Sequence, residues 1–160
     1  MATTGLVEVE KSVGDVNVDE TFPIVVDYDE SIENIAGDES YSWVNRNIIS
    51  RNFPAPKHGK HEVEIEFICF ERETSTKKAI EQIEHQGLRP IDVYELFHLI
   101  DKYPGIPFSV VALGSMLKDP DSKDYLIPYF CRSDSKRSRM RLGHHNINWN
   151  NDHRFAVVHK

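Results

Sequence analysis

The sequence predicts an α+β protein in which two helices pack on a small, mostly antiparallel sheet, with an acidic and partly irregular N-terminal arm. Three observations lead to this fold class: one strongly alternating strand, two amphipathic helical segments directly after it, and a series of short strands separated by turns. The chain has 160 residues, of which 39% are hydrophobic and 28% are charged, as in an ordinary globular protein. We therefore expect one domain over residues 23–160 and an acidic tail over residues 1–22, whose composition is typical of disorder.

The strand over residues 62–70 is the clearest single element. Its apolar residues, beginning with Val63, alternate with three glutamates, so one face is predicted to be buried and the other to face water. A shorter strand is expected over residues 23–28. Between these two strands, the aromatic-rich stretch 41–56 is predicted to pack on the core as a flap or a short helix, and Trp43 is assigned to the core with it.

Two helices are predicted to follow the alternating strand. Ser75 or Thr76 can cap the first helix, and Gly87 supplies the left-handed residue that ends it. The second helix begins after Asp92, and Glu95 stands three residues later, where a capping box places its glutamate. Apolar residues then recur at i, i+3, i+4 and i+7, which predicts one buried face.

The rest of the chain is predicted to form four strands joined by turns. Residues 108–113 are apolar throughout, which favours a central strand. Residues 125–131 form the next strand, and Pro128 places it near an edge or at a bulge because proline cannot donate to a ladder. Shorter strands are expected over 139–142 and 154–158.

This order of elements resembles the C-type-lectin-like fold of bacterial and mobile-element proteins. Two short motifs carry the resemblance, which covers residues 62–160. GLRPIDVYEL, at residues 87–96, is similar to the G-x-R-x-P-T-x-x-E-L motif that begins a helix in bacterial members. WNND, at residues 149–152, is similar to the Trp-Asn-Asp loop before the last lectin strand. The resemblance implies that the first and last strands of this region pair.

The chain also departs from that family. It lacks the Glu-Pro-Asn and Gln-Pro-Asp tripeptides and the paired disulfides of secreted lectins, so the resemblance does not imply a calcium-and-sugar site. The chain is similar, in addition, to small bacterial and mobile-element proteins that end in R-F-x-x-V-x-K. That second likeness implies no activity.

The net charge of −7 is unevenly distributed along the chain. Residues 1–39 hold eleven acidic side chains against one lysine, a charge of −10, whereas the other 121 residues hold 18 bases and 15 acids, a charge of +3. An acidic chain does not favour nucleic acid as a partner, although this alternative stays open. Because there is no long apolar run and no recognisable signal peptide, we expect a cytoplasmic protein that binds no membrane, with Cys69 and Cys131 as free thiols.

The loop over residues 144–154 is the first candidate for a ligand-binding surface. Trp149 is its candidate aromatic anchor, and the asparagines around it are adaptable hydrogen-bonding groups. A core position for Trp149 under the loop is the open alternative. The predicted ligand-binding residues are His144, His145, Asn146, Asn148, Trp149, Asn150, Asn151, Asp152 and Arg154.

Two other interpretations compete with that of a ligand-binding loop over residues 144–154. Metal-assisted hydrolysis would use imidazole and carboxylate ligands from His144, His145, Asp152 and His153. Neighbouring side chains on a strand point to opposite faces, so the first two can both be ligands only if the backbone turns there. Binding of nucleic acid or of a partner protein would use the basic cluster Arg132, Lys136, Arg137, Arg139 and Arg141.

The sequence favours a non-enzymatic binding or interaction module over an enzyme. No nucleophile motif and no glycine-rich phosphate loop is recognisable, so we assign no catalytic residue and no cofactor. The expected partner is a protein or a small polar ligand whose identity the residues do not reveal.

Overall fold

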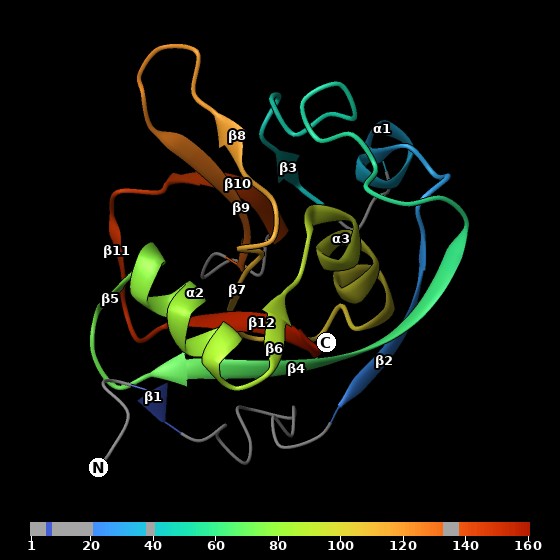
Figure 1. Ribbon diagram of the computed structural model, residues 1–160. Coiled ribbons are helices and arrows are strands. Elements are labelled where there is room, and N and C mark those ends of the chain that lie inside the picture. The colour runs from blue at the N-terminus through green and yellow to red at the C-terminus, as the bar shows by residue number, and fades with distance from the viewer. Residues whose placement is uncertain (1–5, 8–20, 38–40, 133–137) are drawn as a thin grey trace.

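The computed structural model describes residues 6–7, 21–37, 41–132 and 138–160 (Figure 1). Within these ranges three helices lie among the strands: α1 (Ile32–Ala36), α2 (Thr76–His85) and α3 (Val93–Lys102). The strands are β1 (Leu6–Val7), β2 (Phe22–Asp27), β3 (Trp43–Val44), β4 (Lys60–Phe70), β5 (Thr74–Ser75), β6 (Leu88–Pro90), β7 (Ser109–Val111), β8 (Leu117–Lys118), β9 (Tyr125–Arg132), β10 (Ser138–His144), β11 (Asn148–Trp149) and β12 (His153–His159).

A large mixed sheet dominates the fold, and this corrects the predicted fold class of two helices on a small sheet. About 40% of the described residues lie in strands and about 19% in helices. The sheet runs in the order β1-β4-β12-β7-β9-β10-β3, with β2 paired to β4, β6 to β12 and β8 to β9. The antiparallel pairing of β4 with β12 joins the first and last strands of the region 62–160. The β12–β7 and β10–β3 pairs are parallel.

The helices α2 and α3 cover opposite faces of this sheet. Ile65 and Phe67 of β4 belong to the core that contains α3, whereas Ile68 and Phe70 belong to the core that contains α2. The same division runs along β12, where Phe155 joins the core of α2. Strands that are buried on both faces read as continuous apolar runs, which explains the composition of β12 and of the second half of β4.

Local signals place α2 and α3 as predicted. The hydroxyl of Ser75 accepts a hydrogen bond from the backbone of Lys78 and caps α2, and Gly87 beyond its end has a φ of 76°. Asp92 and Glu95 form the reciprocal capping box of α3. These devices involve residues within four positions of each other, so the sequence is sufficient to predict them.

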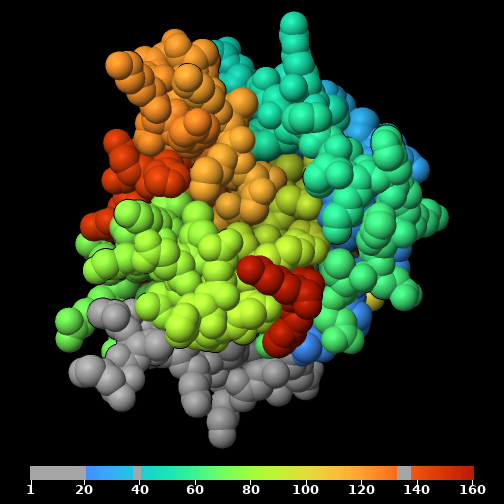
Figure 2. All heavy atoms as spheres, in the orientation of Figure 1, coloured from blue at the N-terminus to red at the C-terminus, as the bar shows by residue number. Residues whose placement is uncertain are grey.

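The short strands explain most of the difference between the predicted small sheet and the observed large sheet. Strands of two or three residues, such as β3, β6 and β8, have too few positions to show a period of two in the sequence. Their partners are distant in sequence, as in the pairing of β6 with the C-terminal β12. At the surface, the last residues lie against the α2–β6 segment (Figure 2), where Lys160 N donates to Gly87 O at 3.1 Å.

Pro128 lies inside the sheet and not near an edge, which was one of the two places, an edge or a bulge, that the sequence predicted for it. Strand β9 pairs with β10 from Leu126 to Arg132, and on its other side it pairs with β7 at Tyr129 and Phe130 and with β8 at Tyr125 and Leu126. Pro128 therefore lies where β9 changes partners, a place at which a missing N–H breaks no ladder bond on that side.

The N-terminal residues and the two cysteines complete the description. Leu6 and Val7, inside the predicted acidic tail, pair with β4, and most of the other residues of that tail lie outside the described ranges. Cys69 is buried, Cys131 is half-buried, and neither forms a disulfide with another described residue. None of the helices in the described ranges is long and apolar enough to span a membrane.

Candidate binding surface

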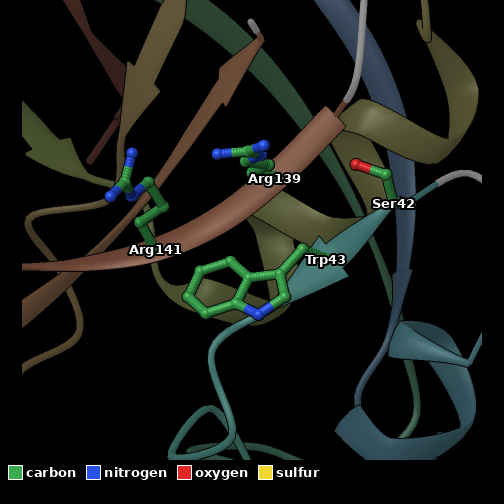
Figure 3. A pocket seen from close by; sticks show the side chains of 4 residues that line it. All are labelled: Ser42, Trp43, Arg139 and Arg141. Carbon is green, nitrogen blue, oxygen red and sulfur yellow. The ribbon is translucent and has the colours of Figure 1, made fainter.

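Strands β3 and β10 lie at the opposite end of the sheet from β1. Because side chains alternate along a strand, Met140 points into the core with α3, while Arg139 and Arg141 point to the other face. Trp43 pairs with Arg139 across the parallel β3–β10 ladder, so its side chain lies on the same face as the arginines. Ser42, Trp43, Arg139 and Arg141 line a hollow of about 380 Å³. Figure 3 shows these four side chains. We call Ser42, Trp43, Arg139 and Arg141 the basic-aromatic face.

Trp43 is 47% exposed, and its predicted place in the core is wrong. Tyr41 is buried against the ring of Phe97 and donates to Phe97 O at 3.2 Å, and Val44 packs on the core. These anchors hold β3 in a register that turns Trp43 outward. Sequence reasoning therefore missed Trp43 and Ser42 as candidate binding residues. The one local signal was that Ser42 and Trp43 stand between Tyr41 and Val44, which both pack into the core.

The positive charge of this face is not neutralised within the described part of the chain. There, neither Arg139 nor Arg141 is ion-paired with a carboxylate, and Arg139 Nε has no hydrogen-bond partner although it is shielded from water. Burial raises the pKa of Tyr129, which pairs with Arg141 across β9 and β10, and the charge of Arg141 opposes this rise. Ser42 donates its hydroxyl to Ser138 O at 2.9 Å.

The structure divides the basic cluster that was predicted from the sequence. Arg139 and Arg141 lie together on the basic-aromatic face. Arg132 has its guanidinium over the ring of Phe130, 5.6 Å from the centroid, and donates to Pro104 O after α3. The side chain of Arg132 therefore lies on the other side of the sheet, because Phe130 faces the core of α3. The remaining two members, Lys136 and Arg137, lie outside the described residues.

Trp149, the candidate anchor of the 144–154 loop, is in the core with only 1% of its surface exposed. Its Nε1 donates to Thr76 Oγ1 at 2.9 Å, and its ring packs edge-on against Tyr129 with centroids 5.7 Å apart. A Cβ at Gly143 would lie 3.1 Å from the indole, so the glycine makes room for it. The core alternative that the sequence left open for Trp149 is therefore the observed one.

The rest of the loop is mostly polar surface. Arg154 is buried and donates to Asn151 O at 2.8 Å, and His145 is half-buried beside Tyr125. The exposed members of the predicted ligand-binding set are His144, Asn146, Asn148, Asn150, Asn151 and Asp152. The loop thus presents amides and carries Ile147 as its exposed apolar residue, but Trp149 is not available to stack on a ligand.

The predicted metal ligands have separate surroundings. His144 Nδ1 is 3.5 Å from Asp124 Oδ2, whereas His153 Nδ1 is 2.8 Å from Asn150 Oδ1 and its ring packs against Trp149. Within the described ranges, no group of three or more His, Cys, Asp or Glu side chains is arranged to hold a metal ion. The structure therefore does not bring together His144, His145, Asp152 and His153.

We predict that acid destabilises the protein in part through His153. Burial lowers the pKa of His153 from its ordinary value of 6.5, against the opposing effects of Asn150 and the charge of Asp152. The unfolded chain takes up a proton near pH 6.5 and the folded chain only at lower pH, so the free energy of unfolding should fall as the pH drops through and below 6.5. Urea unfolding at pH 7.5 and 5.5 measures this fall. It should be smaller in His153→Gln, and an equal fall in the two proteins would contradict the prediction.

A second hollow, of about 190 Å³, lies at the N-terminus of α3. Its polar groups already have partners: Asp92 accepts hydrogen bonds from Glu95 N and from the hydroxyl of Tyr28, both at 2.8 Å, and Ser115 Oγ accepts one from Val93 N at 2.8 Å. Burial and the charge of Glu95 raise the pKa of Asp92. These bonds hold α3 against the loops around it, and we assign this hollow a structural role.

Comparisons with protein families, with curated proteins and with solved structures find no match for this chain. The resemblance to C-type-lectin-like proteins therefore stays a prediction from two short motifs. The case for a function rests on the geometry of the basic-aromatic face.

Proposed function

We propose that this protein is a non-enzymatic binding module whose basic-aromatic face binds an anionic ligand that carries a planar group. The observation that supports it is an exposed tryptophan beside two arginines that have no ion pair among the described residues. Folded chains bury most of the surface of a tryptophan side chain, and an exposed aromatic group with a polar rim is typical of an interaction site.

The chemistry of the two residue types defines the ligand. A guanidinium offers a rigid fork of N–H donors that matches phosphate and carboxylate oxygens, and it binds them through charge-assisted hydrogen bonds. The indole of Trp43 offers a flat apolar surface to a planar ring. Tryptophan and arginine are the residues that most often dominate the affinity of a binding surface. The hollow of about 380 Å³ is of the size that accommodates a small ligand or part of a larger one.

The test compares two anions that differ in their planar group. Isothermal titration calorimetry is carried out with inorganic tripolyphosphate and with adenosine triphosphate, both without divalent cations. We expect both anions to bind and adenosine triphosphate to bind more tightly. The double variant Arg139→Ala/Arg141→Ala should lose both interactions, whereas Trp43→Ala should lose the advantage of the base.

A matched control removes the same charge elsewhere. Lys77 and Lys78 are exposed on α2, so Lys77→Ala/Lys78→Ala changes the net charge equally and leaves the basic-aromatic face intact. Thermal unfolding followed by circular dichroism shows whether each variant is folded. The proposal is wrong if neither anion binds the parent protein, or if the arginine variant binds as tightly as the lysine variant.

A further inference from the structure

We infer that the ligand of the basic-aromatic face is single-stranded nucleic acid, with an unpaired base stacked on Trp43 and neighbouring phosphates bound by Arg139 and Arg141. The inference rests on the proposed function and names its ligand class. Three features of the structure support it: the spacing of the arginines, the exposure of the indole, and the position of the face at the end of the sheet.

The arginines are spaced for a chain of anions. Arg139 and Arg141 are two residues apart on one strand and point to the same face, so their attachment points are about 6.6 Å apart. This distance resembles the separation of successive phosphates along an extended strand, and it allows each guanidinium a phosphate of its own.

The indole of Trp43 selects for unpaired bases. It is nearly half exposed and stands one strand away from Arg139, at about 4.8 Å across the ladder. A base can stack on an aromatic side chain when it is splayed out of a single strand, whereas the bases of a duplex are stacked on one another and present only their edges. A face that offers one large flat ring beside two cations therefore fits a single strand better than a duplex.

The basic-aromatic face lies at one end of the sheet that the described residues form. Strand β3 is the last strand of the sheet, and Arg46 is exposed in the turn directly after it. The acidic residues that make the whole chain negative are concentrated in 1–39, while the rest of the chain has a charge of +3. The basic-aromatic face is thus positive, whereas the whole chain has a negative net charge. That negative net charge was the reason that the sequence did not favour nucleic acid as a partner. We expect recognition without strong base preference, since stacking is tolerant of sequence.

The experiment is fluorescence anisotropy with four labelled probes and the full chain. The probes are oligothymidylate and oligouridylate of about ten nucleotides, a mixed-sequence DNA duplex of the same length, and an oligoglutamate peptide of similar charge. We expect both single strands to bind at least about tenfold more tightly than the duplex or the peptide. With two phosphates bound, the affinity should fall about sevenfold between 50 and 200 mM salt, from a slope of about −1.4.

The variants separate stacking from charge. Trp43→Ala should weaken single-strand binding by at least about fivefold and keep the salt slope, whereas Trp43→Phe should retain part of the affinity. Arg139→Ala/Arg141→Ala should weaken binding and flatten the slope. Tyr125→Ala, which removes another exposed aromatic ring, and Lys77→Ala/Lys78→Ala are the controls that should bind like the parent.

The outcomes distinguish the inference from the proposed function. If the duplex or the peptide binds as tightly as the single strands, and the arginine variant abolishes that binding, the module binds anions but the inference is overturned. If Trp43→Ala leaves single-strand affinity unchanged, stacking is absent and the inference is likewise overturned. If neither of the two phosphate anions binds the parent protein, the proposed function itself fails.

Discussion

Trp149→Ala should lower the free energy of unfolding by about 3–5 kcal/mol, the usual cost of truncating a large buried aromatic residue. The indole is 1% exposed and packs against Tyr129, His153 and Phe155 in the core that contains α2. Its removal leaves a cavity that the paired strands around it cannot close. It also leaves the hydroxyl of Thr76, which is fully buried, without the Nε1 donor at 2.9 Å.

Urea unfolding followed by circular dichroism measures this loss. Trp43→Ala is the matched control, because it removes the same side chain from a position where 47% of it is exposed, and it should cost less than about 1 kcal/mol. Trp149→Phe should fall between the parent and Trp149→Ala, since it keeps an aromatic ring but loses the donor. Equal destabilisation by Trp43→Ala and Trp149→Ala would contradict the burial of Trp149 and the exposure of Trp43.

Arg89→Ala should cost a similar amount, about 3–5 kcal/mol, because it leaves a buried carboxylate without its cation. The side chain of Glu95 is completely buried, and Arg89 binds both of its oxygens, with Nη1 at 2.9 Å from Oε1 and Nη2 at 2.8 Å from Oε2. Glu95 also accepts a bond from Asp92 N as part of the capping box of α3. The ion pair therefore links strand β6 to the start of the helix.

The double variant Arg89→Ala/Glu95→Gln separates the lost contact from the stranded charge. Glutamine keeps the size of the side chain and one oxygen acceptor for Asp92 N, so the double variant should be more stable than Arg89→Ala alone. Arg72→Ala, at an exposed position after β4, is the control and should change stability by less than about 0.5 kcal/mol. A double variant that is no more stable than Arg89→Ala would mean that the buried charge is not the source of the loss.

Elements whose signals lie within a few residues were predictable from the sequence. The capped helices α2 and α3 and the alternating strand β4 are of this kind, because caps, turns of helix and alternation depend on near neighbours. The extent of the sheet was not predictable. The extent of the sheet depends on which short segments pair with an available strand edge. Strand β6, for example, pairs with β12, which lies about 70 residues away in the sequence.

The candidate site was also predictable where its residues lie within a few positions of each other in the sequence. Arg139 and Arg141 stand two apart in a strand, so their shared face follows from the sequence. The place of Arg132 on the other side of the sheet depends on the register of β9 against β10, where Arg132 pairs with Ser138. A single-residue shift of that register would exchange the faces.

The sequence by itself determined the helix ends, the main alternating strand and the presence of two tryptophans near polar residues. The tertiary structure alone decided which tryptophan is buried. Trp149 lies in a polar loop, yet α2 supplies Thr76 and an apolar surface for it. Trp43 lies in an aromatic-rich stretch that was predicted to pack on the core, yet strand pairing turns it outward beside two arginines. Burial depends on what packs against a side chain, and that is set by contacts between residues far apart in the chain.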